Sequence, residues 1–403
     1  MKIKIYKGSA CGKVAAPPSK SMAHRLLIAA AMCEGESTVR RLPLCEDVLA
    51  TLDCLGALGV KTELCGEDIK VYGIDFRKAA ANAPLHCRES GSTMRFMIPL
   101  ALLSGNELKV TGKSGLLARP MTVFEDLAKE HSLKFLKNED GYTVKGPLKA
   151  GEYSLPGNVS SQFITGLMLA LSSLEGDSRI KITGSLESRS YLELTRAALS
   201  VFGVKVVWEN DMSLYVRGGQ RFVPRDVTVE GDYSGAAFLL ALNRLGGDVE
   251  VCGLDKDSLQ GDRVADELLC RLDAKNAEID ITDCPDLGPI LFATASARFG
   301  ATFTGTRRLK IKESDRAAAM AEELSKLGVK VSVFDNTVTV EGGGLTAPNE
   351  ELSGHGDHRI VMSLAVLLTL TGGVVSGAEA ITKSYPDFFE HLTSLGIRCE
   401  IID

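Results

Sequence analysis

Acidic and basic side chains are crowded into one short segment, residues 310–316, which reads KIKESDR. The carboxylates of Glu313 and Asp315 could transfer protons, and the Lys and Arg side chains beside them could bind an anion. Residues 316–327 follow with apolar positions at helical spacing, so we expect a helix to begin near Ser314. Helix starts bind anions because their first backbone N–H groups have no partner in the helix. The alternative is a capped surface helix that carries ion pairs and no ligand.

Further groups of Ser, Gly, Lys and Arg residues stand at other predicted helix starts. Hydroxyl and cationic side chains there would add to the anion-binding surface of the unpaired N–H groups. The recurrence predicts one or two small, highly anionic ligands that are bound from many sides. The groups lie at residues 17–25, 89–95, 117–121, 158–162, 357–359 and 382–387.

The composition limits the class of protein. The chain has 403 residues, enough for two domains, and a formal net charge of −6, so we expect no nucleic-acid partner. Its 10 cysteines form no CxxC pair and no Cys/His cluster, which predicts no metal site and mostly buried thiols in a reducing cytoplasm. The N-terminus lacks the apolar core of a signal peptide, and no apolar run reaches transmembrane length. We therefore expect no membrane partner.

A helix–glycine–strand pattern recurs along the chain. A glycine after a helix can adopt a left-handed conformation and end that helix before a strand. The first four copies start about 72 residues apart, which suits one supersecondary unit and predicts five or six units in all. Apolar spacing also predicts helices over 47–58, 162–174 and 316–327, the second apolar on nearly all sides and therefore buried. The pattern is strong at Gly59, Gly203, Gly328 and Gly396 and weaker near residues 131–133 and 274–276.

Nine short motifs follow one another along the chain. They are PSKSMAHR (18–25), SGSTMR (90–95), ARPM (118–121), NVSSQF (158–163), VEGDYSGAA (229–237), PD (285–286), KESDR (312–316), DHR (357–359) and KSYPDF (383–388). Together they resemble the 5-enolpyruvylshikimate-3-phosphate synthase family over essentially the whole chain.

The resemblance implies an α+β fold of mixed α/β repeats. That family has two similar domains, each built from three βαβαββ units with the helices packed inside. One domain would span residues 19–229, and the other would join residues 1–18 to 230–403. The active site would then lie in the interdomain cleft.

The resemblance also implies an enzyme that needs no cofactor. The family transfers the enolpyruvyl (1-carboxyvinyl) group of phosphoenolpyruvate to the 5-hydroxyl of shikimate-3-phosphate and releases phosphate, a step of the shikimate pathway to chorismate and the aromatic amino acids. Asp286 is then expected to be the base at the 5-hydroxyl, and Glu313 the acid and base at the methylene carbon. Lys20 is expected to contact both substrates and to assist proton transfer. We expect a cytoplasmic monomer.

The same resemblance divides the other candidate residues between the two substrates. The residues implied for shikimate-3-phosphate are Lys20, Ser21, Arg25, Ser160, Ser161, Ser188, Tyr191, Asp286 and Lys312. The residues implied for phosphoenolpyruvate are Lys20, Gly91, Arg119, Gln162, Arg316, His358, Arg359 and Lys383. Glu89, Thr93, Phe96 and Arg308 depart from the commonest family pattern, which bears on the shape of the phosphoenolpyruvate pocket and on glyphosate sensitivity.

Two alternatives remain beside this interpretation. UDP-N-acetylglucosamine enolpyruvyl transferases share the fold and the donor, but they carry a reactive Cys just before their Arg-Pro motif, and residues 112–118 contain none. A non-catalytic protein that binds phosphorylated ligands on the same scaffold is the second alternative. The carboxylates of Asp286 and Glu313 argue against it, because binding of anions alone does not require them.

Overall fold

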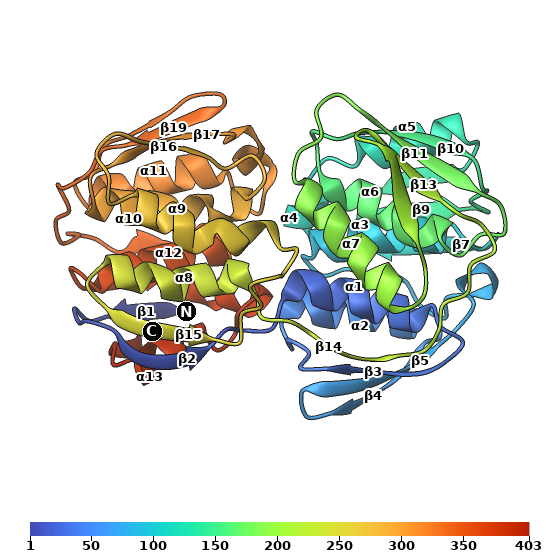
Figure 1. The fold of residues 1–403 in the computed structure, drawn as a ribbon, viewed down its shortest axis with the longest axis horizontal. Coiled ribbons are helices and arrows are strands. Elements are labelled where there is room, and N and C mark those ends of the chain that lie inside the picture. Colours follow the sequence, from blue (N-terminus) through green and yellow to red (C-terminus); the bar gives the residue numbers. More distant parts are fainter. Residues whose placement is uncertain (403) are drawn as a thin grey trace. The chain divides into compact units, whose positions relative to one another are not determined.

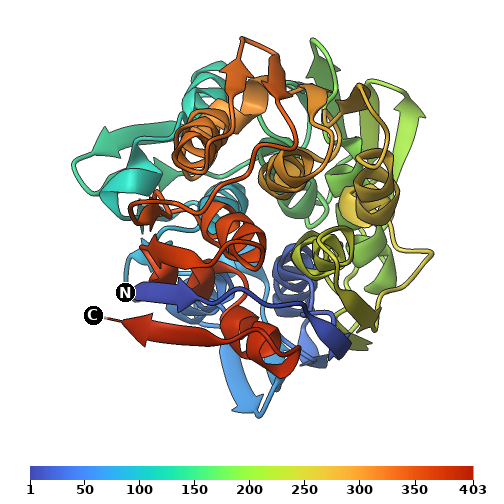
Figure 2. The ribbon, with the colours of Figure 1, turned by 90° about the vertical axis from the view of Figure 1, so that its left-hand side faces the viewer.

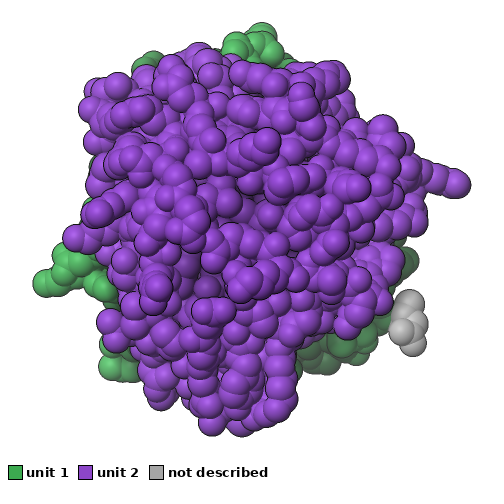
Figure 3. Space-filling model, turned by 90° about the vertical axis from the view of Figure 1, so that its right-hand side faces the viewer, with its two compact units in different colours: residues 1–19, 230–403 green, residues 20–229 purple. Residues whose placement is uncertain are grey.

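The computed structural model describes residues 1–402, which form two compact units (Figure 3). Unit 2 is Lys20–Val229, and unit 1 joins Met1–Ser19 to the segment that starts at Glu230. The chain passes from one unit to the other twice, and the two crossing segments run side by side. Ser19 N donates to Glu230 O at 2.8 Å, and Asp232 N donates to Pro17 O at 2.7 Å.

Unit 2 contains three sheets with one topology. In each four-stranded sheet the first two strands are parallel, and the third and fourth are antiparallel to their neighbours. The sheets, in spatial order, are β14 (Asp226–Thr228), β3 (Gly35–Arg40), β5 (Asp68–Gly73) and β4 (Lys61–Cys65); β6 (Leu85–His86), β7 (Glu107–Thr111), β9 (Gly141–Lys145) and β8 (Lys134–Asn138); and β10 (Glu152–Pro156), β11 (Ser178–Thr183), β13 (Ser213–Val216) and β12 (Val206–Asn210).

Unit 1 repeats this arrangement with one shortened copy. The N-terminal strand β1 lies between two strands from the C-terminal part of the chain, which closes the unit. The third copy keeps only a parallel pair. The sheets are β16 (Ala277–Asp280), β17 (Ala301–Thr304), β19 (Thr337–Val340) and β18 (Val331–Val333); β20 (Leu352–Ser353), β21 (Gly373–Ser376), β1 (Lys2–Ile5) and β22 (Cys399–Ile402); and β15 (Asp248–Cys252) with β2 (Cys11–Ala15).

Helices fill the interior of each unit, and the sheets lie outside them (Figure 1). Figure 2 shows the helices of unit 1 nearly end-on, with strands around them. The helices of unit 2 are α1 (Lys20–Ala31), α2 (Glu46–Ala57), α3 (Gly91–Ala101), α4 (Ser114–Leu117), α5 (Thr122–Glu130), α6 (Ser161–Leu171) and α7 (Arg189–Val201). Those of unit 1 are α8 (Tyr233–Arg244), α9 (Ala265–Arg271), α10 (Gly288–Ala297), α11 (Arg316–Lys326), α12 (His358–Leu368) and α13 (Phe388–Ser394).

Composition explains the burial of two helices. In α6 and α10 nearly every side chain is buried, because these helices are apolar on nearly all sides. Among the described residues no helix is both long and apolar enough to cross a membrane. The α+β fold class with helices inside is confirmed, and so are the helices predicted over 47–58, 162–174 and 316–327, which end one to three residues earlier than expected.

The predicted helix–strand junctions are confirmed by their backbone geometry. Gly59, Gly203, Gly328 and Gly396 all have positive φ, between 80° and 95°. The two weaker copies use Ser132 at φ 54° and Asn276 at φ 56°, so a residue with a side chain adopts the left-handed conformation there. The expectation of mostly buried cysteines is wrong for half of the set, since Cys11, Cys65, Cys252 and Cys270 are exposed and Cys399 is intermediate.

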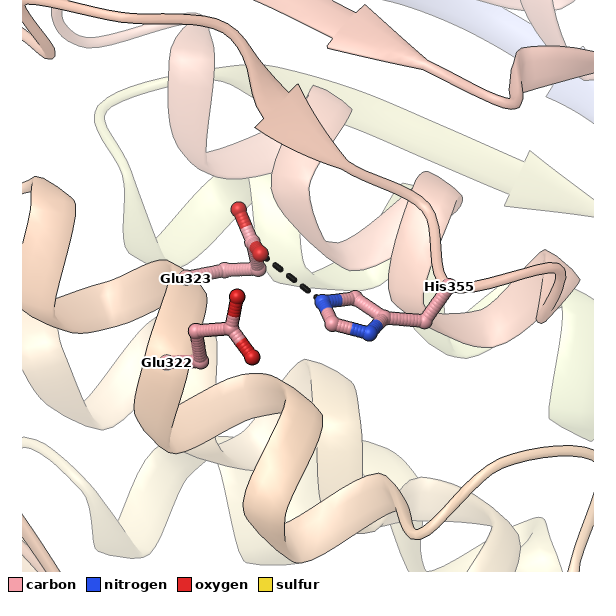
Figure 4. Close-up of side chains that lie close together, drawn as sticks. All are labelled: Glu322, Glu323 and His355. Atoms are coloured by element: carbon pink, nitrogen blue, oxygen red, sulfur yellow. Dashed lines mark hydrogen bonds and ion pairs between the residues drawn. The ribbon is translucent and has the colours of Figure 1, made fainter.

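The buried carboxylate of Glu323 links α11 to β20 and to the segment between β20 and α12. The Glu323 side chain is 0% exposed and accepts from Lys326 Nζ at 3.0 Å, from Ser353 N at 2.8 Å and, depending on the tautomer, from His355 Nε2 at 2.8 Å. Glu322 lies beside Glu323 and His355, and the three side chains are close enough together to be considered as metal ligands (Figure 4). The Lys326 ammonium already supplies the positive charge that buried Glu323 requires, so we interpret the cluster as an ion-pair network.

Replacing Glu323 should destabilise unit 1 strongly. Glu323→Ala leaves Lys326 and the Ser353 N–H without their acceptor, and we expect the free energy of unfolding to fall by about 3 kcal/mol. Glu322→Ala is the matched control, because its side chain is 61% exposed and its loss should change stability by less than about 0.5 kcal/mol. Urea denaturation measures both, and equal effects of the two variants would contradict the assignment of Glu323 as the structural partner.

Candidate functional site

Asp286 and five other charged side chains of unit 1 come together. We call them the Asp286 group. They come from the short 3₁₀ helix Pro285–Leu287, the loop that follows the 3₁₀ helix Arg307–Ile311, and the starts of α11 and α12. The members are Asp286, Lys312, Glu313, Arg316, Asp357 and Arg359.

Helix capping places two members of the Asp286 group. Asp357 is the N-cap of α12, and its Oδ1 accepts from Arg359 N at 2.9 Å. Asp315 is the N-cap of α11 and accepts from Ala318 N at 3.1 Å, so Arg316 becomes the first residue of that helix. The carboxylate of Asp357 therefore both caps a helix and remains available to bind a cation.

Arg316 is the centre of the group. Its side chain is 1% exposed, and its guanidinium donates to three carboxylates. Nη1 lies 2.8 Å from Asp286 Oδ1, Nη2 lies 2.6 Å from Glu313 Oε2, and Nε lies 2.8 Å from Asp357 Oδ2. A guanidinium offers five donors in a fixed plane, which lets one side chain fix the directions of several carboxylates at once.

Asp286 receives two more cations. Lys312 Nζ lies 3.0 Å from Asp286 Oδ1, and Arg359 Nη2 lies 3.3 Å from Asp286 Oδ2. Arg359 Nη1 also donates to the backbone carbonyl of Asp286 at 3.1 Å. The side chain of Asp286 keeps 16% of its surface exposed, so a ligand could reach it.

The charges around Asp286 decide its protonation state. Burial alone would raise the pKa of Asp286, but Arg359, Lys312 and Arg316 outweigh burial and hold that pKa well below its ordinary value. Burial lowers the pKa of Lys312, and the charge of Asp286 opposes that effect. Asp286 is thus an ionised carboxylate at neutral pH, able to accept a proton, beside cations that could bind an anionic substrate.

Two further candidates of unit 1 lie near this group in sequence. His358, the first residue of α12, is 2% exposed, and its Nδ1 lies 3.8 Å from Asp357 Oδ1. Lys383 ends the 3₁₀ helix Ala378–Lys383, and its Nζ donates to Gly356 O at 2.8 Å. Gly356 immediately precedes Asp357, so Lys383 is held beside the start of α12.

Unit 2 holds a buried arginine group around Arg25. The Arg25 side chain donates from Nε to Thr195 Oγ1 at 2.8 Å, from Nη1 to Ser21 O at 2.6 Å and from Nη2 to Tyr191 O at 3.1 Å. The Phe96 ring lies 5.4 Å from the guanidinium carbon. Burial lowers the pKa of Arg25 to about 10, which still leaves it charged at neutral pH. The structure therefore brings together Ser21, Arg25 and Tyr191 of the candidate set.

A second group of unit 2 surrounds Gly91, the first residue of α3. A Cβ atom at Gly91 would meet Arg119 Nη1 at 2.9 Å and Arg95 Nη1 at 3.0 Å, so glycine allows both guanidinium groups to lie in their present positions. Gln162 Oε1 accepts from Arg95 Nη1 at 2.7 Å, and its Nε2 donates to Ser92 Oγ at 2.8 Å. Gly91, Arg119 and Gln162, which the sequence assigned together, are thus neighbours.

Lys20 opens α1 and pairs with the first turn of α2. Its Nζ lies 2.8 Å from Asp47 Oδ2, and both side chains are largely buried, at 14% and 11% exposed. This carboxylate holds the ammonium in one position while leaving part of it accessible. The ion pair therefore gives the Lys20 ammonium a defined position at the start of α1.

The remaining serines and the tyrosine lie at two helix starts of unit 2. Ser160 is the N-cap of α6, and its hydroxyl accepts from Gln162 N at 3.3 Å. Ser161 follows as the first residue of that helix and is 3% exposed. Ser188 precedes α7 in a left-handed conformation at φ 56°, and Tyr191 lies one turn later. Residues of both helices therefore present hydroxyls at N-termini, where anions are favoured.

The sequence missed several residues of these groups. Arg95 is no member of the candidate set, although it contacts Gln162, and Asp47 lies in none of the nine motifs. Asp357 belongs to the DHR motif but not to the candidate set, although it binds Arg316. One signal for Asp47 was available in the sequence. It is an acidic residue in the first turn of the helix that follows the motif containing Lys20.

Two of the departures from the family pattern have a structural role here. Thr93 is buried, lies 2.8 Å from the hydroxyl of Thr51 and donates to Asp47 O at 3.2 Å, so it supports the helix that bears the partner of Lys20. Phe96 packs against Arg25. Glu89 lies 3.5 Å from Lys113, and Arg308 is buried at 6% exposed.

Comparison with known proteins agrees with the fold and the motifs. A model of the EPSP synthase (3-phosphoshikimate 1-carboxyvinyltransferase) family matches residues 7–392. The 3-phosphoshikimate 1-carboxyvinyltransferase of Clostridium kluyveri is 39% identical over 412 residues, which cover 96% of this chain and 95% of that protein. The corresponding protein of Clostridioides difficile is 34% identical over 428 residues, covering 99% and 98%.

Solved structures show the same fold. Two structures of EPSP synthase from Acinetobacter baumannii match with TM-scores of 0.81 at 24% and 23% sequence identity. The match covers 99% and 100% of this chain, respectively, and 100% of each of those chains. With a family model that spans nearly the whole sequence and relatives of similar length, the chain belongs to the EPSP synthase family.

Proposed function

We propose that this protein transfers the enolpyruvyl group of phosphoenolpyruvate to the 5-hydroxyl of shikimate-3-phosphate and releases phosphate. The observation that carries the proposal is Asp286, an ionised carboxylate that contacts Lys312, Arg316 and Arg359. The guanidinium of Arg316 also contacts Glu313. A carboxylate among cations that would bind anions weakens ground-state binding, so its presence there favours a role in proton transfer. Membership of the EPSP synthase family supports the same substrates.

The proposed reaction conserves atoms and protons. Glu313 gives a proton to the methylene carbon of phosphoenolpyruvate, and the adjacent carbon becomes electrophilic. The 5-hydroxyl oxygen bonds to that carbon while Asp286 takes the hydroxyl proton. The tetrahedral intermediate then loses phosphate, which leaves with the proton that Asp286 had taken, while the methyl carbon returns its proton to Glu313 and the enol ether forms.

Glu313 and the proposed donor share one guanidinium. Glu313 Oε2 lies 2.6 Å from Arg316 Nη2. Anionic phosphoenolpyruvate would compete for that guanidinium, which would free the Glu313 carboxyl to act at the methylene carbon.

We assign the binding residues by the same reasoning. Arg316 and Arg359 offer guanidinium forks that suit carboxylate and phosphate, and Arg25 offers a buried one. The proposed phosphoenolpyruvate contacts are Lys20, Gly91, Arg119, Gln162, Arg316, His358, Arg359 and Lys383. The proposed shikimate-3-phosphate contacts are Lys20, Ser21, Arg25, Ser160, Ser161, Ser188, Tyr191, Asp286 and Lys312.

The alternatives are less well supported. The family match and the names of the relatives favour shikimate-3-phosphate over UDP-N-acetylglucosamine as acceptor. A non-catalytic binding protein gives no reason for Asp286 and Glu313 to contact the cations. We further propose that the protein acts as a cytoplasmic monomer.

The acceptor is tested by measuring phosphate release from phosphoenolpyruvate. We expect release with shikimate-3-phosphate and none with UDP-N-acetylglucosamine. Because lysine and arginine side chains supply the positive charge that the anionic substrates require, activity should be unchanged by EDTA. Turnover with the nucleotide sugar, or loss of activity on chelation, would overturn this proposal.

Asp286→Ala separates catalysis from binding. Loss of a general base should lower kcat by about 10²–10⁴-fold. Shikimate-3-phosphate should still bind within about tenfold of the parent affinity, since a single hydroxyl contact is lost. Calorimetric titration and steady-state rates measure the two effects, with Asp283→Ala as a control that removes an exposed carboxylate nearby. A variant that keeps near-normal turnover, or loses binding and turnover in equal proportion, would show that Asp286 is not the base.

A further inference from the structure

A chain of hydrogen bonds leads from Asp286 to a carboxylate that the proposed reaction does not use. Arg359 Nη2, which contacts Asp286 Oδ2, also donates to Ser234 Oγ at 3.2 Å. The Ser234 hydroxyl in turn donates its proton to Asp262 Oδ2. The three links come from α12, the first turn of α8 and the 3₁₀ helix Gly261–Val264, so the chain joins three elements of unit 1.

The whole chain is shielded from water. Asp262 is 4% exposed, Ser234 7% and Arg359 6%. Asp262 Oδ1 is also buried and makes no hydrogen bond with any of residues 1–402. A buried carboxylate is destabilising unless it is fully hydrogen-bonded, so Asp262 lowers the stability of the fold at this position. Asp262 contacts the Ser234 hydroxyl, and the cation that contacts the same hydroxyl is Arg359.

Burial and the surrounding charges set the pKa of Asp262. Burial raises the pKa of Asp262 to about 6, and the negative charge of Asp286 adds to that rise. Arg359, the Ser234 hydrogen bond and Lys312 act in the opposite direction. The buried thiol of Cys284 also faces Asp262, but its own pKa is raised and it stays neutral. Above pH 7 Asp262 is therefore mainly ionised and pulls on the Ser234 proton.

We infer that Asp262 is a positioning residue that acts through Ser234 to hold the Arg359 guanidinium against Asp286. Ionised Asp262 accepts a hydrogen bond from the Ser234 hydroxyl. The lone pairs of the Ser234 oxygen then point toward Arg359. Arg359 is thereby held between Ser234 and the Asp286 carboxylate and carbonyl. This inference rests on the proposed function, in which Arg359 binds phosphoenolpyruvate and Asp286 is the base.

Asp262→Asn tests the inference kinetically. The variant keeps the shape of the side chain and removes its charge, so the charge-assisted contact to Ser234 is lost. We expect kcat/KM for phosphoenolpyruvate to fall about 10- to 100-fold and shikimate-3-phosphate affinity to change less than about threefold. Asp266→Asn is the matched control, because Asp266 is an exposed carboxylate four positions later, and its rates should equal those of the parent.

Coupling to Arg359 distinguishes positioning from general support of the fold. In an Arg359→Ala background, Asp262→Asn should cost less than about twofold, because the side chain that it positions is gone. The thermal midpoint of Asp262→Asn at pH 8 should not fall below that of the parent, since the variant removes a buried charge whose pKa folding raises. Ser234→Ala should reproduce the kinetic loss and serves if Asp262→Asn does not fold. The inference would be overturned if Asp262→Asn had its full effect in the Arg359→Ala background. It would also be overturned if Asp262→Asn alone left kcat/KM at the value of an active parent enzyme.

A crystal structure of Ser234→Ala judges the inference without reference to activity. We expect the Arg359 guanidinium to leave Asp286, so that the present 3.3 Å separation of Nη2 and Oδ2 opens beyond hydrogen-bond distance. A guanidinium that stays in place would refute the positioning role. An inactive parent enzyme would instead refute the proposed function, so the two failures are distinguishable.

Discussion

The contacts of Arg316 with three carboxylates are the interaction on which the charged site of unit 1 depends. Burial disfavours a lone guanidinium, but Asp357, Glu313 and Asp286 outweigh that effect and raise the pKa of Arg316 above its ordinary value. Each carboxylate is likewise tolerated because the guanidinium is present. Each buried charge of the group therefore has its counterpart within the group.

Helix starts provide the framework for this group and for those of unit 2. At Asp357, Asp315, Ser160 and Ser90 a side chain caps the first turn and so sets where the helix begins. Because the helices lie inside the sheets, their termini bring polar groups to the ends of an otherwise apolar core. The same geometry that satisfies unpaired N–H groups thus concentrates cations and hydroxyls where an anion could be bound.

The interior of unit 1 also contains polar links that no substrate needs to touch. Glu323 ties α11 to the segment before α12, and Asp262 is linked through Ser234 of α8 to Arg359 of α12. Both carboxylates are buried, and both links reach a helix that carries members of the Asp286 group. Such links favour one arrangement of the helix starts over others, because any shift would break a buried hydrogen bond. Precision at the site is in this way maintained by residues outside it.

The sequence by itself determined the local features and the family. Apolar spacing located α2, α6 and α11, and turn residues located the repeated helix–strand junctions, because each of these signals lies within a short stretch of the chain. The order of nine short motifs indicated the family. The tertiary structure decided which side chains meet. Arg316 meets Asp357, Arg95 meets Gln162, Lys20 meets Asp47, and Ser234 meets Asp262. These partners are separated by 41, 67, 27 and 28 positions. No local periodicity relates them, since only the packing of helices against one another brings their termini within hydrogen-bond distance.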